Sequence, residues 1–207
     1  MNKLVKDALV LTCITVIAGF ALGLVYEITK GPIAKAEEDA LQKAYQTVFS
    51  DAKSFADMDG FDSAKATDIV VKAGFTDDTI DNCVQALDAD GNPIGYVITV
   101  TSKAGYGGDI TFSLGVTNDG VLNGYSITSI SETAGLGMKA RDTGAGTFSY
   151  QFENRKAEIF TVTKTGASNS SEIDAISAAT ITSRAVTNGV NAGVTYFNSL
   201  VGGAVDE

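Results

Sequence analysis

The feature that most constrains the fold is an uncharged, apolar run of nineteen residues, 8–26, near the N-terminus. As an α-helix rising 1.5 Å per residue, the run spans about 28 Å, close to the thickness of a bilayer's hydrocarbon core. A cleaved signal peptide is the alternative. The run is longer than the usual apolar region of a signal peptide, and no clear Ala-x-Ala site precedes Glu27. We therefore predict that residues 1–30 form an uncleaved, single-pass anchor in the cell membrane.

Positive charges flank this run unevenly. Lys3 and Lys6 precede it, which favours a cytoplasmic N-terminus and an extracytoplasmic position for residues 31–207. Lys30 and Lys35 lie on the other side and reduce the asymmetry. The sequence thus predicts a cytoplasmic N-terminus, and the difference in positive charge between the two sides of the run that supports it is small.

Two glycines inside the run, Gly19 and Gly23, have a G-x-x-x-G spacing. Such a spacing lets another helix approach closely, although glycine is common in membrane helices in any case. If the spacing is a contact face, the anchor packs against integral membrane subunits. The rest of its surface would contact membrane lipid.

Charge and composition exclude several classes of function. The net charge is −10, and because residues 1–30 contribute +1, residues 31–207 carry −11. This acidic balance argues against nucleic acid as a partner. The chain has no histidine, and Cys13 and Cys83 are too few for an iron–sulfur cluster, so no metal site is predicted. A redox function would therefore need an organic cofactor.

After the anchor, the pattern predicts a stalk. Pro32 suits the first position of a second helix, and residues 33–49 have apolar side chains at helical spacing. Residues 50–66 are polar and rich in aspartate, which indicates a loop. We therefore assign residues 31–66 to a stalk helix and an acidic loop. A short strand is predicted over residues 67–74.

The remaining chain predicts an antiparallel sheet. Segments rich in β-branched and aromatic residues cover 83–87, 94–101, 110–116 and 121–130. Short turn sequences separate them, so antiparallel hairpins are expected. Further elements are predicted at 148–153 and 159–162, a final helix from about 182 to 200, and a loose tail over 201–207. The predicted class is α+β: a transmembrane helix followed by one extracytoplasmic domain, residues 67–200, with an antiparallel sheet and flanking helices.

Small residues, hydroxyls and one acid are concentrated in residues 174–183, just before the final helix. The first turn of a helix has unpaired N–H groups and a partial positive charge, so it attracts phosphate. A threonine hydroxyl there can also be esterified by a phosphate. The alternative is that Asp174 or Ser177 is an ordinary N-cap.

This stretch resembles the flavinylation motif of the FMN-binding domain in the Rnf and Nqr respiratory complexes. The matching residues are Asp174, Ser177, Ala179, Thr180 and Thr182. Ala178 stands where the family most often has glycine, and if positive φ is needed there, alanine costs roughly 1 kcal/mol or more. The resemblance implies that a separate flavin transferase uses FAD to attach FMN, through its phosphate, to the Thr180 hydroxyl.

Two glycine-rich loops are candidates for the flavin ring. Their residues are Gly105, Tyr106, Gly107 and Gly108 in one loop, and Glu132, Thr133, Gly135, Leu136 and Gly137 in the other. A flavin ring needs an apolar face and a few hydrogen bonds. Tyr106, Leu136 and Met138 are the candidates for the face, and Glu132, Thr133 and the glycine N–H groups for the polar contacts. Taken alone, each loop is also explained by a tight turn.

The resemblance extends along most of the chain. The membrane helix, the segment 25–33, the two glycine loops and the flavinylation motif occur in the order found in the Rnf G subunit. Ala134 departs from the family, which commonly has proline there. The Nqr C subunit is the alternative, but it is usually longer. The Rnf resemblance implies an electron carrier with covalent FMN, working with other membrane subunits that couple ferredoxin:NAD⁺ oxidoreduction to Na⁺ or H⁺ translocation.

Two other functions remain open from the sequence. The domain could be a membrane-anchored interaction module without a cofactor, for which Ala178 is the best support. It could also bind FMN noncovalently, as a sensor or reductase. Neither alternative requires covalent flavin on Thr180, so this attachment distinguishes both from the leading hypothesis.

Overall fold

The computed structural model describes residues 3–202 of the 207. Contacts divide the chain into two compact units, with the boundary between Ala40 and Leu41. The long helix α1, Lys3–Val48, crosses this boundary. We therefore describe residues 3–40 and the second unit separately. Of the tail predicted to be loose, residues 203–207 lie outside the described part.

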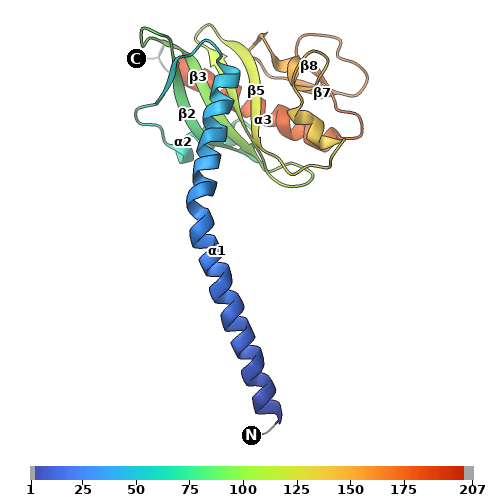
Figure 1. Ribbon diagram of the computed structural model, residues 1–207. Helices are drawn as coiled ribbons and strands as arrows, with labels where there is room; N and C mark the ends of the chain where they lie inside the picture. The colour runs from blue at the N-terminus through green and yellow to red at the C-terminus, as the bar shows by residue number, and fades with distance from the viewer. Residues whose placement is uncertain (1–2, 203–207) are drawn as a thin grey trace. The chain divides into compact units, whose positions relative to one another are not determined.

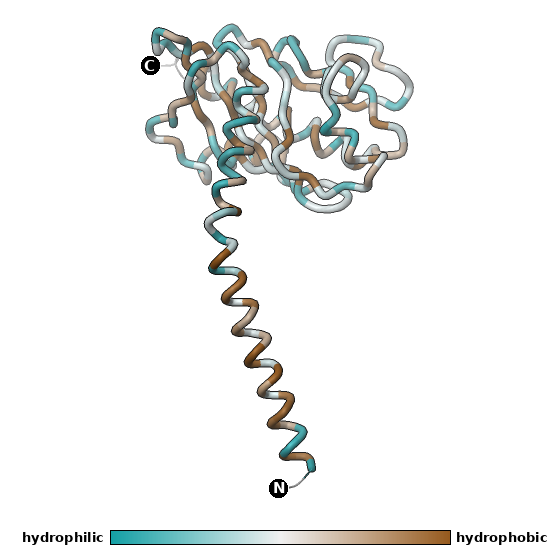
Figure 2. The backbone as a smooth tube through the Cα atoms, viewed as in Figure 1, coloured by the Kyte–Doolittle hydropathy of each residue, from teal (hydrophilic) through white to brown (hydrophobic). Residues whose placement is uncertain are grey.

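The first unit is the helical segment 3–40, whose side chains are almost all exposed. Helix α1 is long and apolar enough to cross a membrane, by length and composition, and Figure 2 shows its apolar stretch. The predicted start of a second helix at Pro32 is wrong, because Pro32 lies inside α1. Proline removes only one intrahelical hydrogen bond, and helix-forming residues lie on both sides of it. The helix therefore continues through Pro32.

The second unit contains an antiparallel sheet of six strands in sequential order, β1 to β6 (Figure 1). The strands are β1 Ser54–Asp57, β2 Asp78–Leu87, β3 Pro93–Ser102, β4 Ile110–Thr117, β5 Val121–Ser129 and β6 Arg155–Lys156. The four central strands are the predicted ones, and they pair as the predicted antiparallel hairpins. The strands β2 to β5 pair with their sequential neighbours because their connections are too short for crossovers.

Helix α3, Thr180–Gly202, packs on one face of this sheet. Phe112 and Leu114, two residues apart on β4, point toward it and are fully buried. A Cβ at Gly189 would lie 2.7 Å from the Phe112 ring, and one at Gly193 would overlap the Leu114 side chain. Glycine at these positions therefore lets α3 approach the sheet, which fixes where its first turn lies.

The opposite face is covered by the end of α1 within the second unit. Tyr45, Val48 and Phe49 are buried against it. The Tyr45 hydroxyl accepts a hydrogen bond from Asn82 Nδ2 at 3.2 Å, and Gly115 lies under Val48. The last turns of the predicted stalk helix thus belong to the core of the second unit.

The loop predicted over residues 50–66 is wrong in part. It contains strand β1, which pairs with β2 from Ser54 opposite Leu87 to Asp57 opposite Val84. Helix α2, Ser63–Lys72, also begins within it. A four-residue edge strand is too short to show a hydrophobic period, so only its pairing reveals it.

The strand predicted over residues 67–74 is also wrong, because residues 67–72 continue α2 and residues 73–74 form the turn after it. The Asp62 carboxylate caps the helix by accepting two backbone N–H bonds, at 3.0 and 3.2 Å. Ala66 and Val70, four residues apart, are buried on one face. Burial of this helix face therefore outweighs the β propensity of the β-branched residues in 67–74.

The long connection between β5 and α3 contains short elements: η1 Gly137–Arg141, η2 Ser149–Phe152, β7 Thr161–Thr163 and β8 Glu172–Asp174. The segment predicted at 148–153 contains η2, and the one at 159–162 overlaps β7. Strand β8 was not predicted, and it pairs in parallel with β7 (Figure 1). The buried Asn191 amide bonds both the N–H and the carbonyl of Phe160, at 2.8 and 2.9 Å, and so attaches this connection to α3.

Candidate functional site

The segment 176–182, here called the acceptor wall, contains the start of α3. The buried Ser183 hydroxyl holds it: Oγ accepts from the Ile176 N–H at 2.9 Å and donates to the Ala179 carbonyl at 2.9 Å. The first helical backbone bond runs from the Ser183 N–H to the same carbonyl, at 3.0 Å. The N–H groups of residues 180–182 therefore have no intrahelical partner, and this end of α3 favours an anion.

Ala178 precedes the helix in a left-handed conformation, with φ 61°. The sequence motif has glycine most often at this position, and a need for positive φ was the expected reason. A non-glycine residue in this region is strained by about 1–2 kcal/mol. The turn is therefore maintained by its surroundings, chiefly the Ser183 hydrogen bonds.

The alternative that Asp174 caps α3 is wrong. Its Oδ1 accepts from the Ala167 N–H at 2.7 Å, and its backbone bonds the Gln151 amide at 2.7 and 3.1 Å. Asp174 thus orders the loop before β8. Ser177 is exposed and lines a second pocket of about 320 Å³, beside Asp174 and Lys139. Within residues 3–202 its hydroxyl makes no hydrogen bond to the start of α3.

The two glycine loops, residues 105–108 and 131–137, form the opposite side of the site, here called the loop wall. Glu132 joins them: Oε1 accepts from the Tyr106 N–H at 2.7 Å and from the Gly107 N–H at 3.2 Å. Its side chain is buried, with 8% of the residue exposed. These two N–H groups and Oε1 are therefore already hydrogen-bonded to each other. This corrects the expectation that all of them form hydrogen bonds to a flavin ring.

Close backbone contacts also hold the loop wall. A Cβ at Gly107 would overlap the Ser131 carbonyl oxygen. A Cβ at Gly137 would lie 2.6 Å from Thr182 Oγ1 and 2.7 Å from Glu132 Oε2. Glycine at Gly137 thus allows the two walls to meet, and the tight-turn interpretation explains only part of its role.

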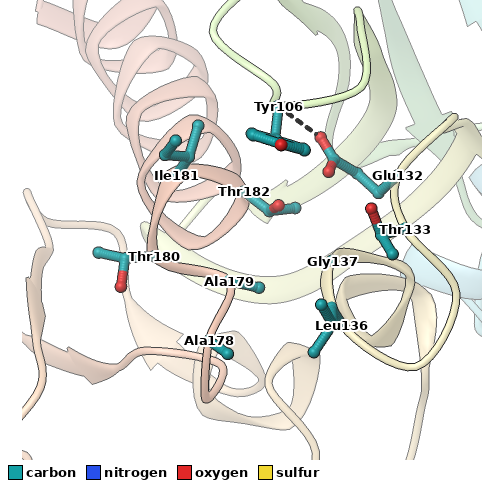
Figure 3. A pocket seen from close by; sticks show the side chains of 10 residues that line it. All are labelled: Tyr106, Glu132, Thr133, Leu136, Gly137, Ala178, Ala179, Thr180, Ile181 and Thr182. Atoms are coloured by element: carbon teal, nitrogen blue, oxygen red, sulfur yellow. Dashed lines mark hydrogen bonds between the residues drawn. The ribbon is translucent and has the colours of Figure 1, made fainter.

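Between the walls lies a pocket of about 600 Å³, within the range of small-molecule sites. Its lining residues are Tyr106, Glu132, Thr133, Leu136, Gly137, Ala178, Ala179, Thr180, Ile181 and Thr182 (Figure 3). Large apolar side chains are exposed on three of its segments: Tyr106 by 71%, Leu136 by 39% and Ile181 by 53%. Apolar surfaces beside an anion-favouring helix end suit a flat, apolar ring that carries a phosphate.

The side chains of the acceptor wall point in different directions (Figure 3). Thr182 points toward Glu132 and Thr133, across the pocket. Thr180 lies on the other side of the helix start, with its hydroxyl directed away from Glu132. A group attached to Thr180 would therefore start at the edge of the pocket rather than in its interior.

Comparison with known proteins places this site in a family. The FMN-binding domain family matches residues 105–195. The G subunit of the Na⁺-translocating ferredoxin:NAD⁺ oxidoreductase complex of Acetobacterium woodii is 32% identical over 198 residues, which cover 94% of this chain and 92% of that one. The chain belongs to the Rnf G-subunit family. A second member, the G subunit of the proton-translocating ferredoxin:NAD⁺ oxidoreductase complex of Clostridium ljungdahlii, is 33% identical and covers 94% of this chain and 91% of its own.

Among solved structures, the crystal structure of Shewanella oneidensis NqrC is similar to this Rnf G-subunit family member. The TM-score is 0.48 at 21% identity, and the match covers 60% of this chain and 62% of that one. The prediction of the Rnf G family over the Nqr C subunit is confirmed by the two G-subunit relatives.

In this family member, the matched residues 105–195 contain both walls of the pocket. Some predicted residues lie elsewhere: Gly105, Gly107, Gly108 and Gly135 belong to the loops but do not line the pocket, and Asp174 and Ser177 line the second one. Met138, expected in the apolar face, lies in η1 and lines neither. Ile181 was missed. Its signal was an apolar residue in the first turn of α3, next to Thr180.

Proposed function

We propose that this protein is an electron-transfer subunit that carries FMN esterified to Thr180. It belongs to a membrane complex that couples ferredoxin:NAD⁺ oxidoreduction to Na⁺ or H⁺ translocation. On this proposal it is a redox carrier with no activity of its own outside the complex. The membership in the Rnf G-subunit family and the match to the FMN-binding domain support this function.

The observation that carries the attachment site is the position of Thr180. It is the first residue of α3, it lines the pocket, and its neighbours Ile181 and Thr182 line it too. The free N–H groups of this first turn would offset the remaining charge of a phosphodiester by about 0.3–1 kcal/mol. Thr182 shares the helix start and the pocket, but it is buried, so Thr180 is the more accessible hydroxyl of the two.

The attachment is a phosphoryl transfer to a hydroxyl. Thr180 Oγ1 forms a bond to the phosphorus on the FMN side of FAD, the bond between the two phosphates breaks, and AMP leaves. The hydroxyl proton is released to the transferase or to solvent. Because the Thr180 hydroxyl points away from Glu132, the transferase can approach it from outside the pocket.

Once attached, the flavin would supply reversible electron transfer. The chain's own residues position it. Tyr106, Leu136 and Ile181 offer exposed apolar surface, and Thr133 and Thr182 offer hydroxyls inside the pocket. The ester at Thr180 prevents loss of the cofactor and limits how far the ring can move.

The membrane arrangement is also part of the proposal. Helix α1 would cross the bilayer once, with Lys3 and Lys6 on the cytoplasmic side and the second unit, which contains the pocket, outside. Membrane lipid and other subunits of the complex would surround the helix. A domain outside the cytoplasm cannot regain a cofactor that dissociates, which is the physical reason for an ester bond there.

Mass spectrometry of the protein extracted from its own membranes tests the attachment. The peptide containing Thr180 should gain the mass of FMN less one water, and flavin fluorescence should remain after denaturation. Thr180→Ala should lose all of this signal, and Thr180→Ser should keep it in part because the hydroxyl remains. Thr195→Ala, on the same helix, is the matched control and should stay fully modified.

Three results contradict the proposal at different points. Covalent flavin that persists in Thr180→Ala would place the ester elsewhere. Flavin released by acid precipitation would indicate noncovalent binding. A domain that resists external protease in intact cells, but not in inverted vesicles, would place it in the cytoplasm.

A further inference from the structure

The Glu132 carboxylate is buried in the wall of the pocket and has no lysine or arginine partner among residues 3–202. Only 8% of the residue is exposed, and it lines the pocket directly. Within residues 3–202, the single ion pair joins Lys65 and Asp62, so no lysine or arginine nitrogen lies within 4.0 Å of Glu132. Buried carboxylates are usually paired, which makes this one unusual.

The two oxygens of this carboxylate have different surroundings. Oε1 accepts the N–H groups of Tyr106 and Gly107, at 2.7 and 3.2 Å. Oε2 lies beside Gly137 on the side of Thr182, where the two walls meet. The hydrogen bonds to Oε1 hold the side chain in place. The charge is thus fixed in position next to the space between Tyr106, Thr182 and Leu136.

We infer that Glu132 lowers the reduction potential of the flavin held in this pocket. The inference rests on the proposed function, since it needs a flavin there. Reduction adds electrons to the ring, and a fixed negative charge nearby opposes this addition. In a pocket of low dielectric the opposition is much stronger than in water. Glu132 therefore acts on the cofactor through its charge, in addition to joining the loops.

Glu132→Gln separates these two roles. The glutamine amide oxygen can still accept the N–H groups of Tyr106 and Gly107, but the charge is gone. Asp119→Asn is the matched control, because it removes one charge from an exposed turn between β4 and β5. Glu132→Asp keeps the charge and shortens the side chain, so it reports on loop geometry.

The experiment uses the full chain, purified in its flavin-bearing form, and first measures covalent flavin by intact mass. A spectroscopic titration with a chemical reductant then gives the midpoint potential of each protein at one pH. In Glu132→Gln the equilibrium for reduction should become at least tenfold more favourable, which is about 30 mV for a two-electron couple. Asp119→Asn should equal the wild type, and Glu132→Asp should shift less than Glu132→Gln. Absorbance follows only loaded molecules, so incomplete loading does not affect the comparison.

The outcomes distinguish the inference from the proposed function. No covalent flavin on the wild-type chain overturns the proposed function. Normal flavin with equal potentials in the wild type and Glu132→Gln overturns the inference alone. A Glu132→Asp shift as large as that of Glu132→Gln overturns it too, because geometry rather than charge would then set the potential. A folded but colourless Glu132→Gln likewise assigns Glu132 to attachment and overturns it.

Discussion

The loop wall and the acceptor wall border the same pocket but are held by different kinds of contact. The loop wall is fixed by backbone against backbone, at Gly107 and Ser131, and by two N–H bonds to the buried Glu132. The acceptor wall is held by the Ser183 hydroxyl and by two local backbone bonds, from the Ala179 N–H to the Ile176 carbonyl and from the Ser183 N–H to the Ala179 carbonyl, and it includes the strained Ala178.

On the proposed function, this difference follows from what each wall has to do. A surface that only receives a ring can be rigid, and close packing makes it so. A segment that presents its threonine to a transferase must be accessible, so fewer contacts are available to hold it. Strain at a functional segment persists only where its surroundings impose it. Substitutions in each wall should therefore have effects of different size and sign.

The largest effect is expected for Gly107→Ala in the loop wall. The new Cβ would overlap the Ser131 carbonyl oxygen, and backbone cannot move aside as a flexible side chain can. We expect the domain to lose about 3 kcal/mol of unfolding free energy, the upper part of the usual range for overpacking. Chemical denaturation followed by circular dichroism measures this loss.

Gly31→Ala is the control for this substitution, because a Cβ there meets nothing within 4 Å. It should leave the unfolding of the second unit unchanged. If Gly107→Ala is as harmless as Gly31→Ala, the loop wall is not held by close packing, and the contrast between the walls is lost.

An intermediate effect is expected for Ser183→Ala in the acceptor wall. The change removes both hydrogen bonds of the hydroxyl and leaves the buried Ile176 N–H without a partner. The cost should be about 2 kcal/mol. Flavin occupancy at Thr180 should fall as well, because the turn that presents Thr180 is no longer held.

Ser199→Ala tests the same change on the same helix, at an exposed site where the hydroxyl bonds only the Tyr196 carbonyl. Thermal unfolding and intact mass should both be close to wild type for this variant. Equal losses in the two variants would show that Ser183 has no special role in the acceptor wall.

The smallest effect, and the opposite sign, is expected for Ala178→Gly. Glycine adopts φ 61° without strain but has more freedom in the unfolded chain, so the net gain should be about 0.5–1 kcal/mol. Ala175→Gly, where φ is not positive, should instead lose stability. Chemical denaturation gives the midpoint of each variant. If both midpoints shift in the same direction from the wild type, Ala178 is not strained.

Much of this protein was predictable from its sequence because the signals are local. The apolar run of residues 8–26, the four central strands with their turns and the final helix all carry periods or turn residues that act over short distances. One position of one motif raised the question of a positive φ at Ala178, and the structure has it. The β-branched residues of 67–74 were misleading, since burial of Ala66 and Val70 on the sheet decided for a helix.

The sequence by itself indicated which segments line the pocket: the two glycine loops and the start of the final helix. Only the tertiary structure decided how they are used. It directs Glu132 to the N–H groups of the other loop, removes Met138 from the pocket and adds Ile181. It also assigns Asp174 to a neighbouring loop. The reason is physical: a motif records which chemical groups are present, whereas their partners depend on contacts between residues far apart in the chain, here set by the close approach of α3 to β4.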